Sequence, residues 1–234
     1  LEAWPWAAGI RAKRLSSGLI NDSFRIDNDQ GVVGVLQRLN TSIFDASVQE
    51  DIEALTQHLQ SRGVTTPTIL RTRRGELAHQ NAAHEVWRVL TWVGEETIDA
   101  VTSRDAARSA AKLVARFHGA LEDFSWNFRH QRPSPHDTAK HMSNLQAALQ
   151  QHSAHRLFPE VAPVADAILK AWQALGEPVN LPSRVIHGDL KISNVRFVGP
   201  QALALIDLDT IARGRLDDEL GDALRSWCNE AGED

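Results

Sequence analysis

The first ninety residues alternate apolar and polar positions in short runs that are typical of β-strands. Residues 20–26 alternate, residues 27–31 form a polar stretch that ends in glycine, and a β-branched run occupies residues 32–36. Two such runs on either side of a glycine-marked turn favour a β-hairpin. We therefore predict that a glycine-containing loop at residues 16–18 leads into a hairpin.

A helical period follows this hairpin. Its apolar positions recur at spacings of three and four residues: Val48, Ile52, Leu55 and Leu59. Asp45 is placed to cap this helix, and Gly63 stands where a glycine would end it. Residues 68–70 and 85–90 have the apolar character of further strands. The pattern predicts a small sheet with one helix that buries a single face.

Beyond a predicted linker at residues 93–96 the pattern becomes mainly helical. Residues 103–121 carry apolar side chains on one helical face, and residues 142–149 and 161–175 are weaker repeats of this type. One β insertion, between residues 185 and 208, interrupts these helices. The chain is therefore predicted to be an α+β protein with a small β-rich lobe over residues 1–93 and a larger, mainly helical lobe over residues 94–234.

Composition narrows the class of protein. The 234 residues are 42% hydrophobic, which is enough for one large core or for two lobes with a cleft between them. With 25 Lys and Arg against 30 Asp and Glu, the net charge of −5 supplies no positive field for a nucleic-acid backbone. No apolar run approaches the 18 residues of a membrane span, and the lone Cys228 excludes a disulfide framework. We expect a cytoplasmic protein that binds neither nucleic acids nor membranes.

Most of the chemical information lies in the β insertion. Residues 195–198 and 202–206 have strand character, so Asn194 and Asp207 are predicted side by side at the open end of a hairpin. An amide oxygen and a carboxylate that meet there suit Mg²⁺, which takes its other ligands from water and substrate phosphates. Asp189, five residues before Asn194, is placed to accept a proton from a hydroxyl group. Together these are the components of a phosphoryl-transfer site.

The spacing of this segment is that of a known catalytic loop. From His187 to Asn194 it reads H-x-D-x-x-x-x-N, as in protein kinases, and Asp207 stands where their D-F-G aspartate would be. With Gly188 after the histidine, the loop resembles the aminoglycoside phosphotransferase and choline kinase family, whose members phosphorylate small-molecule hydroxyls. Further segments in the family's order narrow the resemblance to N-acetylhexosamine 1-kinase-like enzymes: residues 18–24, 35–40, 87–91, 136–138, 205–210 and 221–225.

The resemblance implies a bilobal kinase-like fold, ATP as phosphoryl donor, Mg²⁺ as cofactor, and a small-molecule hydroxyl, foremost that of a sugar, as acceptor. It implies that Asp189 is the catalytic base, that Lys191 reaches the transferring phosphoryl group, and that Asn194 and Asp207 hold the metal. The residues expected to bind the nucleotide are Ser17, Gly18, Asn21 and Ser23 in a flap, Gln37 or Arg38 on a strand, and Leu90 and Trp92 at the hinge.

Four other residues around the loop are expected to have supporting roles. Asp209 lies one side-chain alternation beyond Asp207 and is placed to support the same site. Asp222 and Arg225 are interpreted as residues that brace the catalytic loop, and His187 as a structural residue, because the adjacent aspartate already serves as base.

Three features depart from the kinase pattern. The strand lysine is missing, and either Gln37 or Arg38 replaces it. Only one of these two residues can face the cleft, because successive strand residues face opposite sides. The helix glutamate that would pair with that residue is either Glu50 or Glu53. The flap has one glycine, Gly18, so its grip on phosphates must rely on other groups.

These departures leave two alternatives open. One is a kinase for another acceptor, such as an aminoglycoside, choline or ethanolamine, or a homoserine-like compound. The acidic run at residues 217–219 would suit a polycationic antibiotic. The other is a non-catalytic nucleotide-binding domain with a kinase-like fold. Because the family continues with more helices past residue 234, we also expect that the chain is truncated within the larger lobe.

Overall fold

The computed structural model describes residues 1–6, 9–15, 20–101, 103–130, 137–176 and 181–229. By their contacts they form two compact units, the first of Leu1–Arg132 with Ser183–Asp234 and the second of Pro133–Pro182. The lobe boundary predicted between residues 93 and 94 lies inside the first unit and stays a prediction. Strands dominate the first ninety residues and helices most of the rest, so the predicted α+β class is confirmed.

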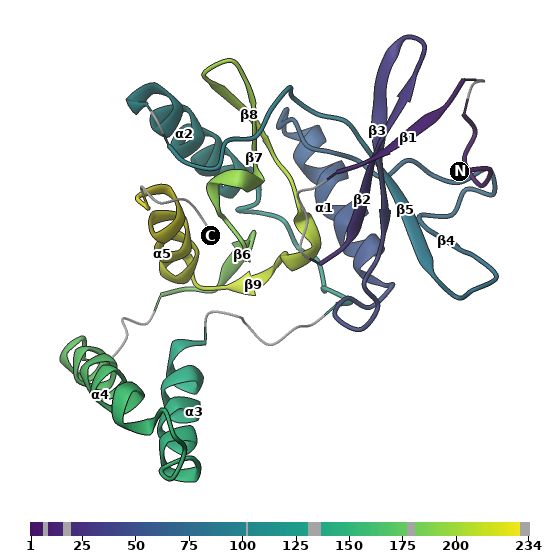
Figure 1. Cartoon of the computed structure of the whole chain (residues 1–234). Helices are drawn as coiled ribbons and strands as arrows, with labels where there is room; N and C mark the ends of the chain where they lie inside the picture. Colours follow the sequence, from purple (N-terminus) through teal and green to yellow (C-terminus); the bar gives the residue numbers. More distant parts are fainter. Residues whose placement is uncertain (7–8, 16–19, 102, 131–136, 177–180, 230–234) are drawn as a thin grey trace. The chain divides into compact units, whose positions relative to one another are not determined.

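The first unit contains a five-stranded antiparallel sheet in the order β1-β2-β3-β5-β4 (Figure 1). Its strands are β1 Arg11–Arg14, β2 Asp22–Asn28, β3 Gly31–Arg38, β4 His79–Gln80 and β5 Val86–Thr91. The predicted hairpin is confirmed as β2 and β3. Sequence reasoning missed β1 and β4, since both are short and polar. The strand predicted at residues 68–70 is reduced to one isolated bridge between Ile69 and Leu90.

Helix α1, Val48–Ser61, buries the predicted apolar stripe against the sheet and against core residues that come later in the chain. It begins later than predicted. The carboxylate of Asp45 accepts a hydrogen bond from the Ser47 N–H at 2.8 Å, so Asp45 caps the preceding turn rather than the helix itself. Gly63, with φ of +71°, follows the end of the helix as expected.

Alternation along β3 and β5 sends two kinds of side chain to opposite faces of the sheet. Leu36 and Val89 pack with Trp4 in a small apolar core on one face. Gln37 and Arg88 are register partners on the other face, and Arg88 reaches Gln49 of α1. The strand register therefore buries polar side chains between the sheet and α1.

The second half of this unit is built from two strand pairs and two helices. Its elements are α2 Arg104–Ala120, β6 Arg184–Ile186, β7 Val195–Val198, β8 Gln201–Leu205, β9 Ala212–Gly214 and α5 Leu216–Trp227. The hairpin predicted between Asn194 and Asp207 is confirmed as β7 and β8, and β6 pairs with β9. Ser103 caps α2, since its hydroxyl accepts from the Ala106 N–H at 3.1 Å.

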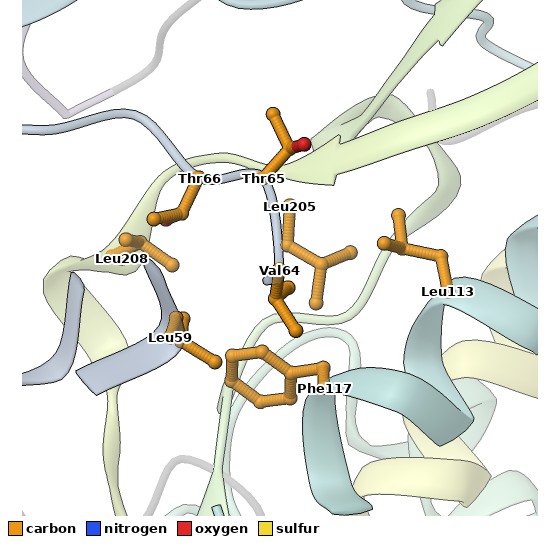
Figure 2. A pocket seen from close by; sticks show the side chains of 8 residues that line it. All are labelled: Leu59, Val64, Thr65, Thr66, Leu113, Phe117, Leu205 and Leu208. Atoms are coloured by element: carbon orange, nitrogen blue, oxygen red, sulfur yellow. The ribbon is translucent and has the colours of Figure 1, made fainter. Parts of the chain in front are cut away.

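The strand end that carries Asp207 is anchored in the apolar core. Leu205 and Leu208, on either side of Asp207, line a tight pocket with Phe117 of α2 (Figure 2). The other side chains that line it are Leu59, Val64, Thr65, Thr66 and Leu113. The pocket leaves no room for a water molecule. It is therefore packing that fixes the hairpin end, and not a ligand site.

The described part of the second unit contains the two helices predicted at residues 142–149 and 161–175. They are α3 Thr138–Gln151 and α4 Phe158–Ala174, both longer than their apolar repeats indicated. No helix in the described residues combines the length and the apolar character that crossing a membrane requires.

Candidate active site

The loop after β6 brings together three of the predicted site residues. The side-chain amide of Asn194 donates to the Asp189 carboxylate at 3.0 Å and to the Asp189 carbonyl at 2.8 Å. The Lys191 Nζ lies 3.1 Å from the same carboxylate oxygen of Asp189. The Asp189 side chain is 30% exposed, so an incoming hydroxyl can still reach it. Asn194 and Lys191 thus orient an accessible carboxylate.

Asp207 lies where the hairpin geometry predicted, beside Asn194. The Ile206 N–H donates to the Asn194 carbonyl at 2.9 Å, which joins the two ends of β7 and β8. The backbone of Asp207 is left-handed, with φ of 62° and ψ of 56°. Holding a side-chain-bearing residue there costs about 1 to 3 kcal/mol, and such positions cluster at functional sites. The hairpin therefore ends in a strained residue.

Negative charge accumulates around Asp207. Part of the Asp207 side chain is exposed. The surrounding protein nevertheless reduces its hydration, and this loss, with the nearby Asp209 and Asp189 carboxylates, raises its pKa to about 6. Arg88 and His187 oppose this rise only in part. A cation beside Asp207 would relieve the repulsion between the carboxylates.

Asn194 and Asp207 fit a magnesium ion that shares its shell with phosphates. Since the Asn194 amide nitrogen donates to Asp189, its amide oxygen is the atom that can ligate a metal. Among the described residues, no group of three or more His, Cys, Asp or Glu side chains is arranged to hold a metal. A site with few protein ligands is typical of Mg²⁺ bound together with substrate phosphates.

The raised pKa of Asp207 predicts how stability depends on pH. The folded protein binds the proton of Asp207 more tightly than the unfolded chain, whose aspartates titrate near about 3.9. Stability without metal should therefore fall as the pH rises from about 4 to about 6. Asp207→Asn lacks this titration, so its melting temperature should rise relative to wild type across that window. Thermal unfolding in EDTA at a series of pH values measures the difference, and a constant difference contradicts the prediction.

Side chains of helix α5 bind the backbone of the loop at residues 187–192. The carboxylate of Glu219 accepts from the His187 and Gly188 N–H groups, and Asp222 accepts from the Leu190 N–H, all at 2.9 Å. Ser226 accepts from the Ile192 N–H at the same distance. The bracing role predicted for Asp222 is confirmed by this contact.

Arg225 contributes through Asp222, to which its guanidinium donates at 3.0 Å. Sequence reasoning missed Glu219 and Ser226, although they share one face of the helix with Asp222 at spacings of three and four. This polar face of the helix was the sequence signal that could have revealed Glu219 and Ser226.

Two residues shape the loop itself. The His187 ring contacts the Ile206 carbonyl at 2.8 Å, in keeping with the structural role expected for it. Gly188 has φ of +80°, and a Cβ atom there would lie 2.5 Å from the Thr210 carbonyl oxygen. The glycine is required because the loop passes close to the segment that follows Asp207.

The predicted flap residues fall into two groups. Ser17 and Gly18 lie outside the described residues. Asn21 is buried, and its side-chain amide donates to Asp209 at 2.9 Å while its oxygen accepts from the Asn40 N–H. Ser23 is also buried, and its hydroxyl accepts from Gln37 at 3.0 Å. The side chains of Asn21 and Ser23 are therefore held in the protein interior.

The strand register distinguishes Gln37 from Arg38. Gln37 faces α1, whereas Arg38 is exposed on the other side, where it pairs with Asp22 and with Glu85. A buried polar cluster consists of Gln37, Gln49, Arg88 and Asp209. Of the two residues proposed to replace the strand lysine, only Gln37 belongs to this cluster.

The expected helix glutamate is absent from this cluster. Glu53 pairs with Arg71 at 2.5 Å, and Glu50 lies 3.6 Å from Arg129. The expectation that either would pair with residue 37 or 38 is wrong, because both face outward from α1. The α1 side chain that contacts Arg88 is instead Gln49, which is 2% exposed.

Sequence reasoning also missed Arg88, which supplies the buried positive charge of the site. Its guanidinium binds both carboxylate oxygens of Asp209, at 2.5 and 2.7 Å, and both side chains are essentially inaccessible to solvent. A charged residue in the middle of an apolar strand was the signal that could have revealed it. Asp209 lies near the site as expected, in contact with this arginine.

The segment that follows β5, which was predicted to be the hinge, is fixed to β7. Arg196 donates to the Val93 carbonyl at 2.8 Å and to the Gly94 carbonyl at 3.2 Å. Its guanidinium also stacks 4.5 Å from the centre of the Trp92 ring. Leu90 pairs with Val35 in the sheet. The roles of Leu90 and Trp92 in binding adenine stay predictions.

A strand-rich part with one helix, followed by a helical part that carries Asp189, Asn194 and Asp207 on one loop and hairpin, is the arrangement of a protein-kinase-like fold. The chain belongs to the phosphotransferase enzyme family, whose model matches residues 11–234.

Homoserine kinases are among the proteins similar to this chain. One from Methylocella silvestris is 28% identical over 95% of this chain and 66% of its own length. One from Neisseria meningitidis serogroup B is 24% identical over 95% of this chain and 68% of its own length. The chain thus spans about two thirds of the curated relatives it matches.

Solved structures share the fold at low identity. An amicoumacin kinase in complex with AMP-PNP and Ca²⁺ superposes with a TM-score of 0.67 at 10% identity, covering 96% of this chain and 66% of that one. A GDP complex of aminoglycoside 2'-phosphotransferase-IIIa gives 0.66 at 16% identity, covering 96% and 75%. A microcompartment-associated aminopropanol kinase gives 0.63 at 16%, covering 95% and 71%. These likenesses confirm the predicted kinase-like fold.

Proposed function

We propose that the protein is an ATP-dependent small-molecule kinase that transfers the γ-phosphoryl group to a hydroxyl. The observation that carries this proposal is the convergence of Asp189, Asn194 and Asp207, with Lys191 3.1 Å from the Asp189 carboxylate. Membership of the phosphotransferase family supports it. With ATP as donor and one free cysteine, we place the reaction in the cytoplasm.

In the proposed mechanism, the acceptor oxygen bonds to the γ-phosphorus as the bond between phosphorus and the ADP oxygen breaks. Asp189 takes the hydroxyl proton, and the hydrogen bond from Asn194 holds its carboxylate in place. Lys191 offsets negative charge on the transferring group. Asn194 and Asp207 would hold Mg²⁺, which when bound neutralises phosphate charge.

For the acceptor, we favour a homoserine-like amino alcohol over a sugar. Support comes from the homoserine kinases among the relatives and from the aminopropanol kinase among the structural neighbours. The acidic run that would suit a polycationic antibiotic is engaged elsewhere. Asp217 and Asp218 lie against Arg215, and Glu219 is buried against the catalytic loop.

An acceptor screen tests this function. ADP release with Mg²⁺ and ATP should be at least about tenfold faster, as kcat/KM, with homoserine or aminopropanol than with hexoses, N-acetylhexosamines, aminoglycosides or choline, because recognition of a small polar substrate discriminates by more than about 1.4 kcal/mol. A sugar as the best acceptor would restore the sugar-kinase hypothesis. Stabilisation by ATP without turnover of any acceptor would favour the non-catalytic alternative.

A further inference from the structure

The buried cation of this site has no donor left for a phosphate. Arg88 donates from Nε and Nη2 to Gln37 at 2.9 and 2.7 Å, from Nη1 and Nη2 to Asp209 at 2.5 and 2.7 Å, and from Nη1 to Gln49 at 3.4 Å. A guanidinium has five N–H donors, and these contacts use all of them. Arg88 is also 0% exposed. A nucleotide could bind Arg88 only after breaking one of these bonds.

The contacts of Arg88 lead instead to the metal-binding end of the hairpin. Asp209 lies two residues beyond Asp207, in the 3₁₀ turn Leu208–Thr210 that begins at the strained Asp207 backbone. Arg88 grips both oxygens of Asp209, and Asn21 of the flap donates to one of them. A two-point grip of this kind fixes the orientation of a carboxylate as well as its position.

In this cluster the positive charge of Arg88 is not balanced by a glutamate of the helix, as it would be in a pair between a strand lysine and a helix glutamate. The acidic partner comes from the metal-binding turn, while Gln37 and Gln49 are neutral. A second buried carboxylate or ammonium would have no opposite charge to pair with, which is costly in the interior. Neutral side chains at positions 37 and 49 follow from this balance.

We propose, on the basis of the proposed function, that Arg88 is a positioning residue that sets the metal-binding turn through Asp209 and does not contact the nucleotide phosphates. Gln37, in this view, does not replace the strand lysine as a phosphate ligand. It orients Arg88 through its oxygen and the flap residue Ser23 through its amide nitrogen.

Variants at residues 88, 37 and 49 test the proposal, with binding of Mn²⁺ and AMP-PNP to the full chain as the readout. Arg88→Lys keeps the charge but cannot bridge two carboxylate oxygens and Gln37, so affinity for Mn²⁺ should fall at least tenfold. The acceptor KM should change less than threefold while kcat falls. Arg11→Lys, on an exposed arginine paired with Asp29, is the matched control and should bind as wild type does.

Gln37→Lys restores the lysine of protein kinases and separates the two interpretations. It should weaken Mn²⁺ and AMP-PNP binding, because lysine cannot accept the two bonds from Arg88 and adds a second buried cation. Tighter nucleotide binding by this variant overturns the proposal, since residue 37 would then be a phosphate ligand. Gln49→Glu should weaken Mn²⁺ binding too. If Arg88→Lys does not fold, Gln37→Lys and Gln49→Glu test the proposal in its place.

Wild-type affinity for Mn²⁺ in folded Arg88→Lys would also overturn the proposal, even if the melting temperature fell, because Arg88 would then only stabilise the fold. Electron paramagnetic resonance of free Mn²⁺ measures this affinity without turnover. An absence of turnover in wild type would therefore contradict the proposed function and leave the positioning role decided by the binding data alone.

Discussion

Asp189→Asn is expected to lower kcat for phosphoryl transfer by about 10²- to 10⁴-fold, the usual contribution of a positioned general base. The side chain keeps its size and can still accept the hydrogen bond from Asn194, but it no longer takes a proton from the acceptor. The KM for ATP should change little, since the metal-binding pair is untouched. Steady-state assays with the best acceptor of the screen measure both constants.

The matched control for this prediction is Asp29→Asn, which removes an exposed carboxylate that pairs with Arg11. It should retain the wild-type kcat. A kcat for Asp189→Asn above a tenth of the wild-type value would show that another group, or water, accepts the proton. A melting temperature low enough to unfold Asp189→Asn at the assay temperature would assign the loss of kcat to folding instead.

The sequence was sufficient to predict the loop at residues 187–194 and the hairpin that follows it, because their signals are local. Asp189 and Asn194 are five residues apart, and one hairpin brings Asp207 beside them, so turn and strand patterns are sufficient to predict their proximity. Helices α1 and α2 were predicted for a similar reason, since each buries one periodic apolar face. The roles of these residues in catalysis remain proposals.

The buried network was not predictable from such signals. Arg88 and Asp209 are 121 positions apart, and Asn21 and Asp209 are 188 apart. Alternation along β3 showed that Gln37 and Arg38 face opposite sides, but only the pairing of β3 with β5 decides which one is inside. The contacts of α1 depend in the same way on how the helix is rotated against the sheet, and the sequence pattern left this rotation open.

Glu219→Ala is expected to destabilise the fold by about 3 to 5 kcal/mol, the usual cost of removing one partner from a buried charged network. It would leave the buried His187 and Gly188 N–H groups without their acceptor, and would remove the carboxylate that lies 3.2 Å from His118. Burial alone would raise the pKa of Glu219, but the His118 and His187 imidazoles and the two N–H donors outweigh it and lower the pKa below its ordinary value. The carboxylate is therefore ionised at neutral pH, and its stabilisation is lost only as the pH falls below about 4.3.

Urea unfolding at neutral pH measures this loss, with Asp217→Ala as the matched control on the same helix. Asp217 is exposed and lies in the first turn of α5 beside Arg215, so its removal should cost less than about 1 kcal/mol. Equal losses for the two variants would mean that helix charge, and not the grip on the loop, accounts for the effect. Because the same two N–H groups shape the loop that holds Asp189, the folded fraction of Glu219→Ala should also lose phosphoryl transfer more than Asp217→Ala does.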